Sequence, residues 1–153
     1  MKAKHSVKLK SKYMIMKDKY SIALVAHDNK KADMVSFVMK RLEFFNNEKI
    51  EIWATGTTGK HIYDAGVHKV NRLQSGPLGG DAQIASMIVE GKIDALVFFV
   101  DPLDVHPHQV DVSMLLRICN VHNIAVAPNY ASAKALVSYC KEKLLENKGG
   151  TIK

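Results

Sequence analysis

Long apolar segments are absent from this sequence. The longest uninterrupted apolar run, Ala95 to Val100, has the length of a strand and is far too short to cross a membrane. The N-terminal region also lacks the apolar core of a secretory signal, so we expect a cytoplasmic protein without a membrane partner. Cysteine is scarce. Cys119 and Cys140 both fall in predicted helices, where reduced, buried thiols are the expected state.

Several common ligand-binding and catalytic motifs are absent as well. The segment Thr55-Gly56-Thr57-Thr58-Gly59-Lys60 lacks the spacing of a Walker loop, and there is no dinucleotide-binding fingerprint. Without a serine elbow or a cysteine–histidine pairing, covalent catalysis is not expected. His106-Pro107-His108 could suggest a metal, but no thiol or spaced histidine pair completes a set of ligands. We therefore predict that no metal is bound.

Positive charge is concentrated at the N-terminus. The net charge is +7, and residues 1–20 carry seven lysines against a single acid, Asp18. Such an arm could contact nucleic acid or an acidic surface. Because it has neither arginine nor a recognisable motif spacing, we predict a flexible basic extension and no nucleic-acid partner.

The rest of the chain alternates short apolar runs with helical periodicity. Strands are predicted over residues 21–26, 50–54 and 94–100, over 124–127, and more weakly over 69–73. Helical spacing recurs over residues 34–45, 62–65, 82–90, 114–118 and 131–145. This alternation predicts a three-layer α/β fold with a mostly parallel sheet flanked by helices. We expect one domain over residues 21–148 and a frayed tail at 149–153.

The segment Ser75-Gly76-Pro77-Leu78-Gly79-Gly80-Asp81 is the centre of the predicted site. Its three glycines and one proline exclude regular structure and let a ligand approach the backbone closely. It leads into the predicted helix at residues 82–90, and the unpaired amides of a helix start suit phosphate. Asp81 has two interpretations: an N-cap of that helix, or a carboxylate beside a phosphate that removes a proton.

Four polar segments follow predicted strands: His27-Asp28, residues 55–59, residues 75–81 and residues 101–111. Because ligands bind at the carboxyl ends of parallel strands, these segments should meet at one rim of the sheet. Hydroxyls, backbone amides and an ammonium there could hold a phosphate. The groups in question belong to Thr55, Thr57, Thr58, Ser75, Gly76, Gly79 and Lys31.

The same rim gathers titratable groups, namely Asp28, Asp81, Asp101, Asp111, His27 and His108. Carboxylates and imidazoles facing a phosphate suggest proton abstraction next to the carbonyl of a phosphorylated small molecule. A neutral imidazole could donate a hydrogen bond to the oxygen of the developing enediolate. Structural interpretations stay open: an Asx-turn at Asp101, a helix N-cap at Asp111, and a backbone-bonded histidine at His27.

Taken together, these segments resemble the methylglyoxal synthase family. The matching pieces occur in the family's order over about residues 21–130. They are Ala26-His27-Asp28 with Lys31, Ala54–Gly59, Ser75–Asp81, Glu90–Asp94, and Asp101-Pro102-Leu103 followed by Pro107-His108 and Asp111. The resemblance implies a lyase that converts dihydroxyacetone phosphate to methylglyoxal and inorganic phosphate through an enediolate, without metal or organic cofactor.

By this resemblance, Asp81 is the base that removes the C3 proton, and His108 polarises the carbonyl. The implied phosphate ligands are Lys31, Thr55, Thr57, Thr58, Ser75 and Gly76. Asp28, Asp101 and Asp111 shape the charge of the site, and His27 lies beside the substrate. The family also implies a homohexamer inhibited by phosphate. The alternative is a regulatory module of the same fold that binds a phosphorylated effector without catalysis.

Overall fold

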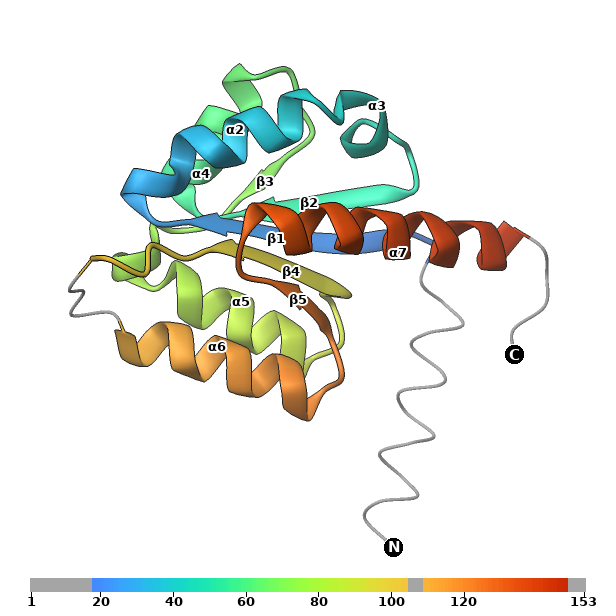
Figure 1. Cartoon of the computed structure of the whole chain (residues 1–153). Coiled ribbons are helices and arrows are strands. Elements are labelled where there is room, and N and C mark those ends of the chain that lie inside the picture. The colour runs from blue at the N-terminus through green and yellow to red at the C-terminus, as the bar shows by residue number, and fades with distance from the viewer. Residues whose placement is uncertain (1–17, 105–108, 149–153) are drawn as a thin grey trace, which may run out of the picture.

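The sheet at the centre of the computed structural model has five strands in the order β3-β2-β1-β4-β5, all parallel (Figure 1). The structure describes residues 18–104 and 109–148. The strands are β1 (Tyr20–Ala26), β2 (Ile50–Ala54), β3 (Asn71–Arg72), β4 (Ala95–Phe99) and β5 (Ala125–Ala127). The predicted three-layer α/β architecture is confirmed.

Helices cover both faces of this sheet (Figure 1). The helices are α2 (Lys31–Met39), α3 (Leu42–Phe45), α4 (Gly56–Asp64), α5 (Gly80–Val89), α6 (Gln109–Val121) and α7 (Tyr130–Lys148). Two short 3-10 turns, η1 (Asp28–Lys30) and η2 (Gly76–Leu78), precede α2 and α5. Among the described residues, no helix is both long and apolar enough to cross a membrane.

Strands β1 and β4 are buried on both faces, as their unbroken apolar runs predict. Successive side chains of a strand point to opposite faces. Ile22 and Leu24 therefore pack into the core beneath α2, α3, α4 and α7, whereas Ala23 and Val25 pack into the core beneath α5 and α6. The two cores hold the β1 backbone between them, so the loop at its carboxyl end starts from a rigid position.

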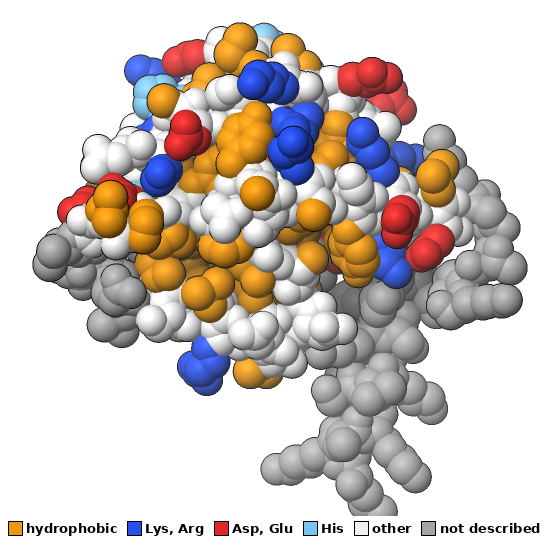
Figure 2. Space-filling model, viewed as in Figure 1, with side chains coloured by type: hydrophobic (Ala, Val, Ile, Leu, Met, Phe, Trp, Pro, Cys, Tyr) orange, Lys and Arg blue, Asp and Glu red, His pale blue; other side chains and the backbone are white. Residues whose placement is uncertain are grey.

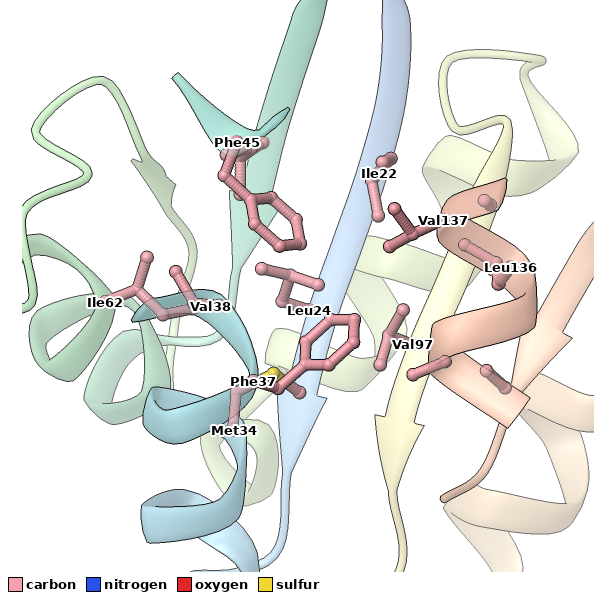
Figure 3. Close-up of a cluster of buried hydrophobic side chains, with 14 of the residues drawn as sticks. Ile22, Leu24, Met34, Phe37, Val38, Phe45, Ile62, Val97, Leu136 and Val137 are labelled. Atoms are coloured by element: carbon pink, nitrogen blue, oxygen red, sulfur yellow. The ribbon is translucent and has the colours of Figure 1, made fainter. Parts of the chain in front are cut away.

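Phe37 of α2 is the centre of the first core (Figure 3). Its ring is fully buried and lies edge-on to Phe45, Phe99 and Tyr130 at centroid distances of 5.4–5.8 Å. The Arg41 guanidinium carbon lies 4.4 Å from the centroid of the Phe37 ring. These contacts fix α2 against the sheet, and α2 begins at the rim where ligands bind.

One predicted helix is divided in the structure. The apolar spacing over residues 34–45 predicts a single helix, but α2 ends at Met39 and α3 begins only at Leu42. Arg41 has φ −135° and ψ 33°, which is not helical. The helical prediction is wrong at this position because the turn lets Phe44 and Phe45 reach the core, while Arg41 stacks over Phe37.

Candidate active site

A cavity of about 220 Å³ lies at the carboxyl ends of β1, β2 and β4. Its lining combines apolar strand ends with the polar segments that follow them. The lining residues are Val25, Ala26, His27, Asp28, Lys31, Thr55, Thr57, Thr58, Ser75, Gly76, Pro77, Asp81 and Phe98. Nine of the residues predicted for the site therefore lie around one cavity, although they span residues 27–81 of the chain.

The polar segment at residues 55–59 begins helix α4, ahead of the helical spacing predicted over residues 62–65. Thr55 is the N-cap of α4, and the first helical bond runs from the Gly59 N–H to the Thr55 carbonyl at 2.7 Å. The first N–H groups of a helix have no acceptor within it, so the amides of Thr57 and Thr58 are available to an anion. The Thr58 hydroxyl is buried and makes no hydrogen bond within the described residues. The oxygens of a phosphate could accept hydrogen bonds from these amides and from this hydroxyl.

The Ser75 segment is packed backbone to backbone against this helix start. The Gln74 carbonyl accepts a hydrogen bond from the Gly56 N–H at 3.1 Å, and the Ser75 carbonyl accepts one from the Gly80 N–H at 3.0 Å. A Cβ on Gly80 would lie only 2.1 Å from the Gln74 carbonyl oxygen, so only glycine fits there. The close approach brings Ser75 and the Thr55 turn to the same wall of the cavity.

Asp81 is buried at the first turn of α5, with 8% of its surface exposed. The N-cap position is occupied by Gly79, whose φ of +111° lies in the left-handed region that glycine adopts freely. The N-cap interpretation of Asp81 is therefore wrong. A Cβ on Gly76 would lie 3.1 Å from the Asp81 Oδ1 atom, which places the carboxylate directly against the Ser75 segment. A carboxylate thus lies beside the anion-binding amides.

Lys31 supplies positive charge at the start of α2. Its Nζ contacts the Oδ1 atom of Asp28, three residues earlier on η1. The Lys31 side chain is 18% exposed and that of Asp28 is 88% exposed. The ammonium is thus held close to the protein surface, while its carboxylate partner extends into solvent. Because solvent screens the exposed carboxylate, Asp28 offsets only part of the attraction of the ammonium for an anion in the cavity.

Asp101 is not among the residues that line the cavity. Its Oδ2 atom accepts a hydrogen bond from the Asn29 side-chain amide at 2.9 Å, and its Oδ1 atom accepts one from the Leu103 N–H at 3.0 Å. The second bond forms the Asx-turn that was one of its predicted interpretations. The Asn29 amide and the Leu103 N–H lower the pKa of Asp101 below its ordinary value, because both stabilise the ionised form.

Asp111 is a further predicted residue that is absent from the cavity lining. Asp111 lies in the first turn of α6, two residues after the helix begins at Gln109, so the N-cap prediction is wrong. His108 lies outside the described residues. Asn29 does not line the cavity either, but its bond to Asp101 is a contact that sequence reasoning missed. Its position between Asp28 and Lys30 in a polar segment after a strand was the available signal.

A larger hollow of about 510 Å³ lies at the opposite, amino ends of the strands. It is bordered by charged residues that include Lys49 and Lys69. The Lys69 ammonium is already bonded to the carbonyls of Asn47 and Ile50. By size alone, this hollow would be the better candidate for a ligand-binding site. The smaller cavity, however, has the buried carboxylate, the hydroxyls and the helix amides on which catalysis depends. Within the described residues, no group of three potential metal ligands occurs.

Comparison with known proteins agrees with this geometry. A family model described as an MGS-like domain matches residues 33–127. The chain is 47% identical over 121 residues to the methylglyoxal synthase of Moorella thermoacetica, covering 79% of this chain and 93% of that protein. It is 50% identical over 116 residues to the methylglyoxal synthase of Clostridium beijerinckii, covering 76% and 96%. This chain belongs to the methylglyoxal synthase family.

A solved structure of the methylglyoxal synthase family shares the fold. The crystal structure of methylglyoxal synthase from Elizabethkingia anophelis NUHP1 matches with a TM-score of 0.73 and 44% sequence identity, over 79% of this chain and 78% of that chain. The predicted family is confirmed. Because these relatives carry the name of an enzyme and span most of this chain, they favour the catalytic interpretation over the regulatory module.

Proposed function

We propose that this protein converts dihydroxyacetone phosphate to methylglyoxal and inorganic phosphate. The observation that carries the proposal is the buried Asp81 carboxylate in the same cavity as the amides and hydroxyls at the start of α4. The substrate phosphate would bind to this helix start, to Ser75 and Gly76, and to Lys31. The carbon skeleton would then extend toward Asp81.

The reaction begins with proton abstraction. Asp81 removes a proton from C3, and the electron pair forms the C2–C3 double bond of an enediolate whose charge lies on the C2 oxygen. The C3 hydroxyl then loses its proton, its electrons form the C3 carbonyl, and the C2–C3 double bond moves to C1–C2. The bond from C1 to the bridging oxygen breaks, and phosphate leaves with that electron pair. The remaining enolate, whose charge is still on the C2 oxygen, takes up a proton at C1 and becomes methylglyoxal.

Donors to the C2 oxygen stabilise the charge that develops in the first step. His27 lines the cavity, and we propose it as one such donor. We assign the same role to His108, as the family resemblance implies. Asp28 would influence the charge of the site through its contact with Lys31, and we retain Asp111 as a more distant contributor to that charge.

The test is turnover by the purified protein. Wild type mixed with dihydroxyacetone phosphate should release methylglyoxal and phosphate in equal amounts. Asp81→Asn keeps the size of the side chain and removes the base, so kcat should fall by roughly a thousandfold or more. Asp33→Asn, on the exposed face of α2, is the matched control and should retain wild-type activity. Well-folded wild type that binds phosphorylated ligands without turnover would establish the binding module instead.

We further propose a cytoplasmic homohexamer inhibited by inorganic phosphate. Membership of the family supports the assembly, and the anion-binding helix start supports the inhibition because product phosphate would occupy the substrate's place. Figure 2 shows hydrophobic side chains gathered on the viewed face of the molecule. Exposed large apolar side chains include Leu78 and Val121, which are 76% and 68% exposed. Light scattering on the purified protein measures the assembly directly.

A further inference from the structure

The imidazole of His27 is held by neighbours from β4 and the segment after it. The backbone N–H of His27 donates to the Phe99 carbonyl at 3.1 Å, and the imidazole ring lies edge-on to Phe98 with the centroids 5.2 Å apart. The backbone N–H of Asp101 donates to the Nδ1 atom of His27 at 2.9 Å. An amide N–H can only donate, so Nδ1 is the unprotonated nitrogen of a neutral ring, and the proton lies on Nε2.

We propose that this contact keeps His27 as a neutral Nε2–H donor in the cavity, and that Asp101 is a positioning residue for His27. The first half rests on the proposed function, because the donor would meet an oxygen of the phosphorylated substrate. The second half reassigns Asp101, which the family resemblance groups with the residues that set the charge of the site. Both halves rest on the contact between His27 and Asp101, which are 74 positions apart in the chain.

The side-chain contacts of Asp101 support the positioning role. Both carboxylate oxygens are already bonded, one to Asn29 and the other to Leu103. The Asn29 bond joins the segment after β1 to the segment after β4, and the Leu103 bond fixes the turn that follows Asp101. Together they hold the Asp101 backbone N–H toward His27. A carboxylate engaged in this way, outside the cavity lining, is poorly placed to exchange a proton with a substrate.

A neutral donor suits the chemistry of an enediolate. A hydrogen bond from neutral imidazole stabilises negative charge as it develops on oxygen, without complete proton transfer. To become an imidazolium, His27 would have to place an Nδ1–H against the Asp101 N–H and lose that bond. Among the described residues, the charged groups around His27 are Asp28, Lys31 and Asp81 in the cavity and Asp101, whose backbone N–H meets the ring. The carboxylates favour a charged ring and Lys31 opposes it, whereas the backbone contact favours the neutral ring.

Two substitutions of His27 separate the donor from the structural contact. In His27→Gln, the amide nitrogen reaches the place of Nε2 and keeps a donor there. In His27→Asn, the amide oxygen reaches the place of Nδ1 and keeps the acceptor for Asp101, but no donor replaces Nε2. We expect His27→Asn to lower kcat by about a hundredfold or more, and His27→Gln to stay within about tenfold of wild type. Equal or higher activity of His27→Asn would overturn the donor role.

The protonation state of the His27 imidazole can be measured in the absence of substrate turnover. Imidazole nitrogen-15 shifts of the labelled wild-type protein distinguish the two neutral tautomers and the charged ring, and the His27 signals are identified by their loss in His27→Gln. We expect the Nε2–H tautomer at neutral pH. A proton on Nδ1 would refute the proposal. If wild type shows this tautomer but no turnover, the proposed function fails while the backbone contact stands.

Asp101 is tested by comparing two variants. Asp101→Asn keeps an oxygen for the Leu103 N–H, and Asn29 can turn its amide to bond the new side chain. Asp101→Ala removes both bonds. We expect Asp101→Asn to retain kcat within about tenfold of wild type and to preserve the His27 nitrogen shifts, whereas Asp101→Ala should lower kcat further and change those shifts. Equally large losses of kcat in both variants, with unchanged His27 shifts, would show that the carboxylate itself acts in the chemistry.

Discussion

Replacing Gly80 by alanine should damage the site through backbone crowding. A Cβ at this position would lie 2.1 Å from the Gln74 carbonyl oxygen and 2.9 Å from Thr55 Cγ2. The first distance is 0.9 Å below the 3.0 Å that real Cβ contacts respect, so the backbone must move by about that amount. The Gln74 carbonyl also holds the Gly56 N–H, and Asp81 is the next residue after Gly80. The displacement therefore reaches both the start of α4 and Asp81, on two sides of the cavity.

The size of the effect follows from this displacement. Overpacking costs about 1–3 kcal/mol of the free energy of unfolding, and moving a catalytic group by about 1 Å costs on the order of a hundredfold in rate. We expect Gly80→Ala to remain folded, with kcat/KM for dihydroxyacetone phosphate reduced about a hundredfold. Urea denaturation measures the stability, and steady-state kinetics measures the rate.

Gly91→Ala is the matched control. Gly91 follows the other end of α5 and has φ +75°. Apart from its two chain neighbours, no atom of the described residues lies within 4 Å of the position that a Cβ would take. Alanine there should cost about 1–2 kcal/mol because of the left-handed backbone, without altering the cavity. Its stability loss should resemble that of Gly80→Ala, and its kcat/KM should equal that of wild type. If Gly80→Ala is folded and fully active, the argument that Gly80 positions Asp81 is wrong.

Two further predictions concern charge. Lys31→Met should raise KM and the inhibition constant of phosphate by roughly tenfold or more with a smaller effect on kcat, because the ammonium holds phosphate in both the ground state and the transition state. The control is Lys60→Met, at an exposed position on α4, which should change neither constant. Equal effects in the two variants would contradict this role of Lys31. Burial raises the pKa of Cys119 to about 11 and that of Cys140 to about 12, against an ordinary value of 9.0. As the pH rises, the unfolded chain loses these thiol protons before the folded chain does. The free energy of unfolding should therefore fall as the pH rises from 9.0 toward 11, and it should fall by less in Cys140→Ala. If urea titrations give the same pH dependence of the free energy of unfolding for both proteins, the raised pKa of Cys140 is refuted.

The local sequence pattern alone predicted much of the fold and the location of the site. The unbroken apolar runs at 21–26 and 94–100 identify the two central strands, because a strand buried on both faces needs apolar side chains on each. Parallel strands place their carboxyl ends at one edge, so the polar segments after them had to converge. The cavity contains nine of the predicted residues for this reason.

Tertiary contacts decided what the side chains at that rim do. Sequence cannot show that Gly79 takes the N-cap position, which leaves Asp81 buried against Gly76. Nor does it show that the Asp101 backbone N–H meets His27, because that contact joins two loops far apart in the chain and depends on the spacing of β1 and β4. Residue types and their order determined which groups reach the rim. Their protonation and orientation depend on distances of a few ångströms, which arise only when the sheet and both helix layers pack together.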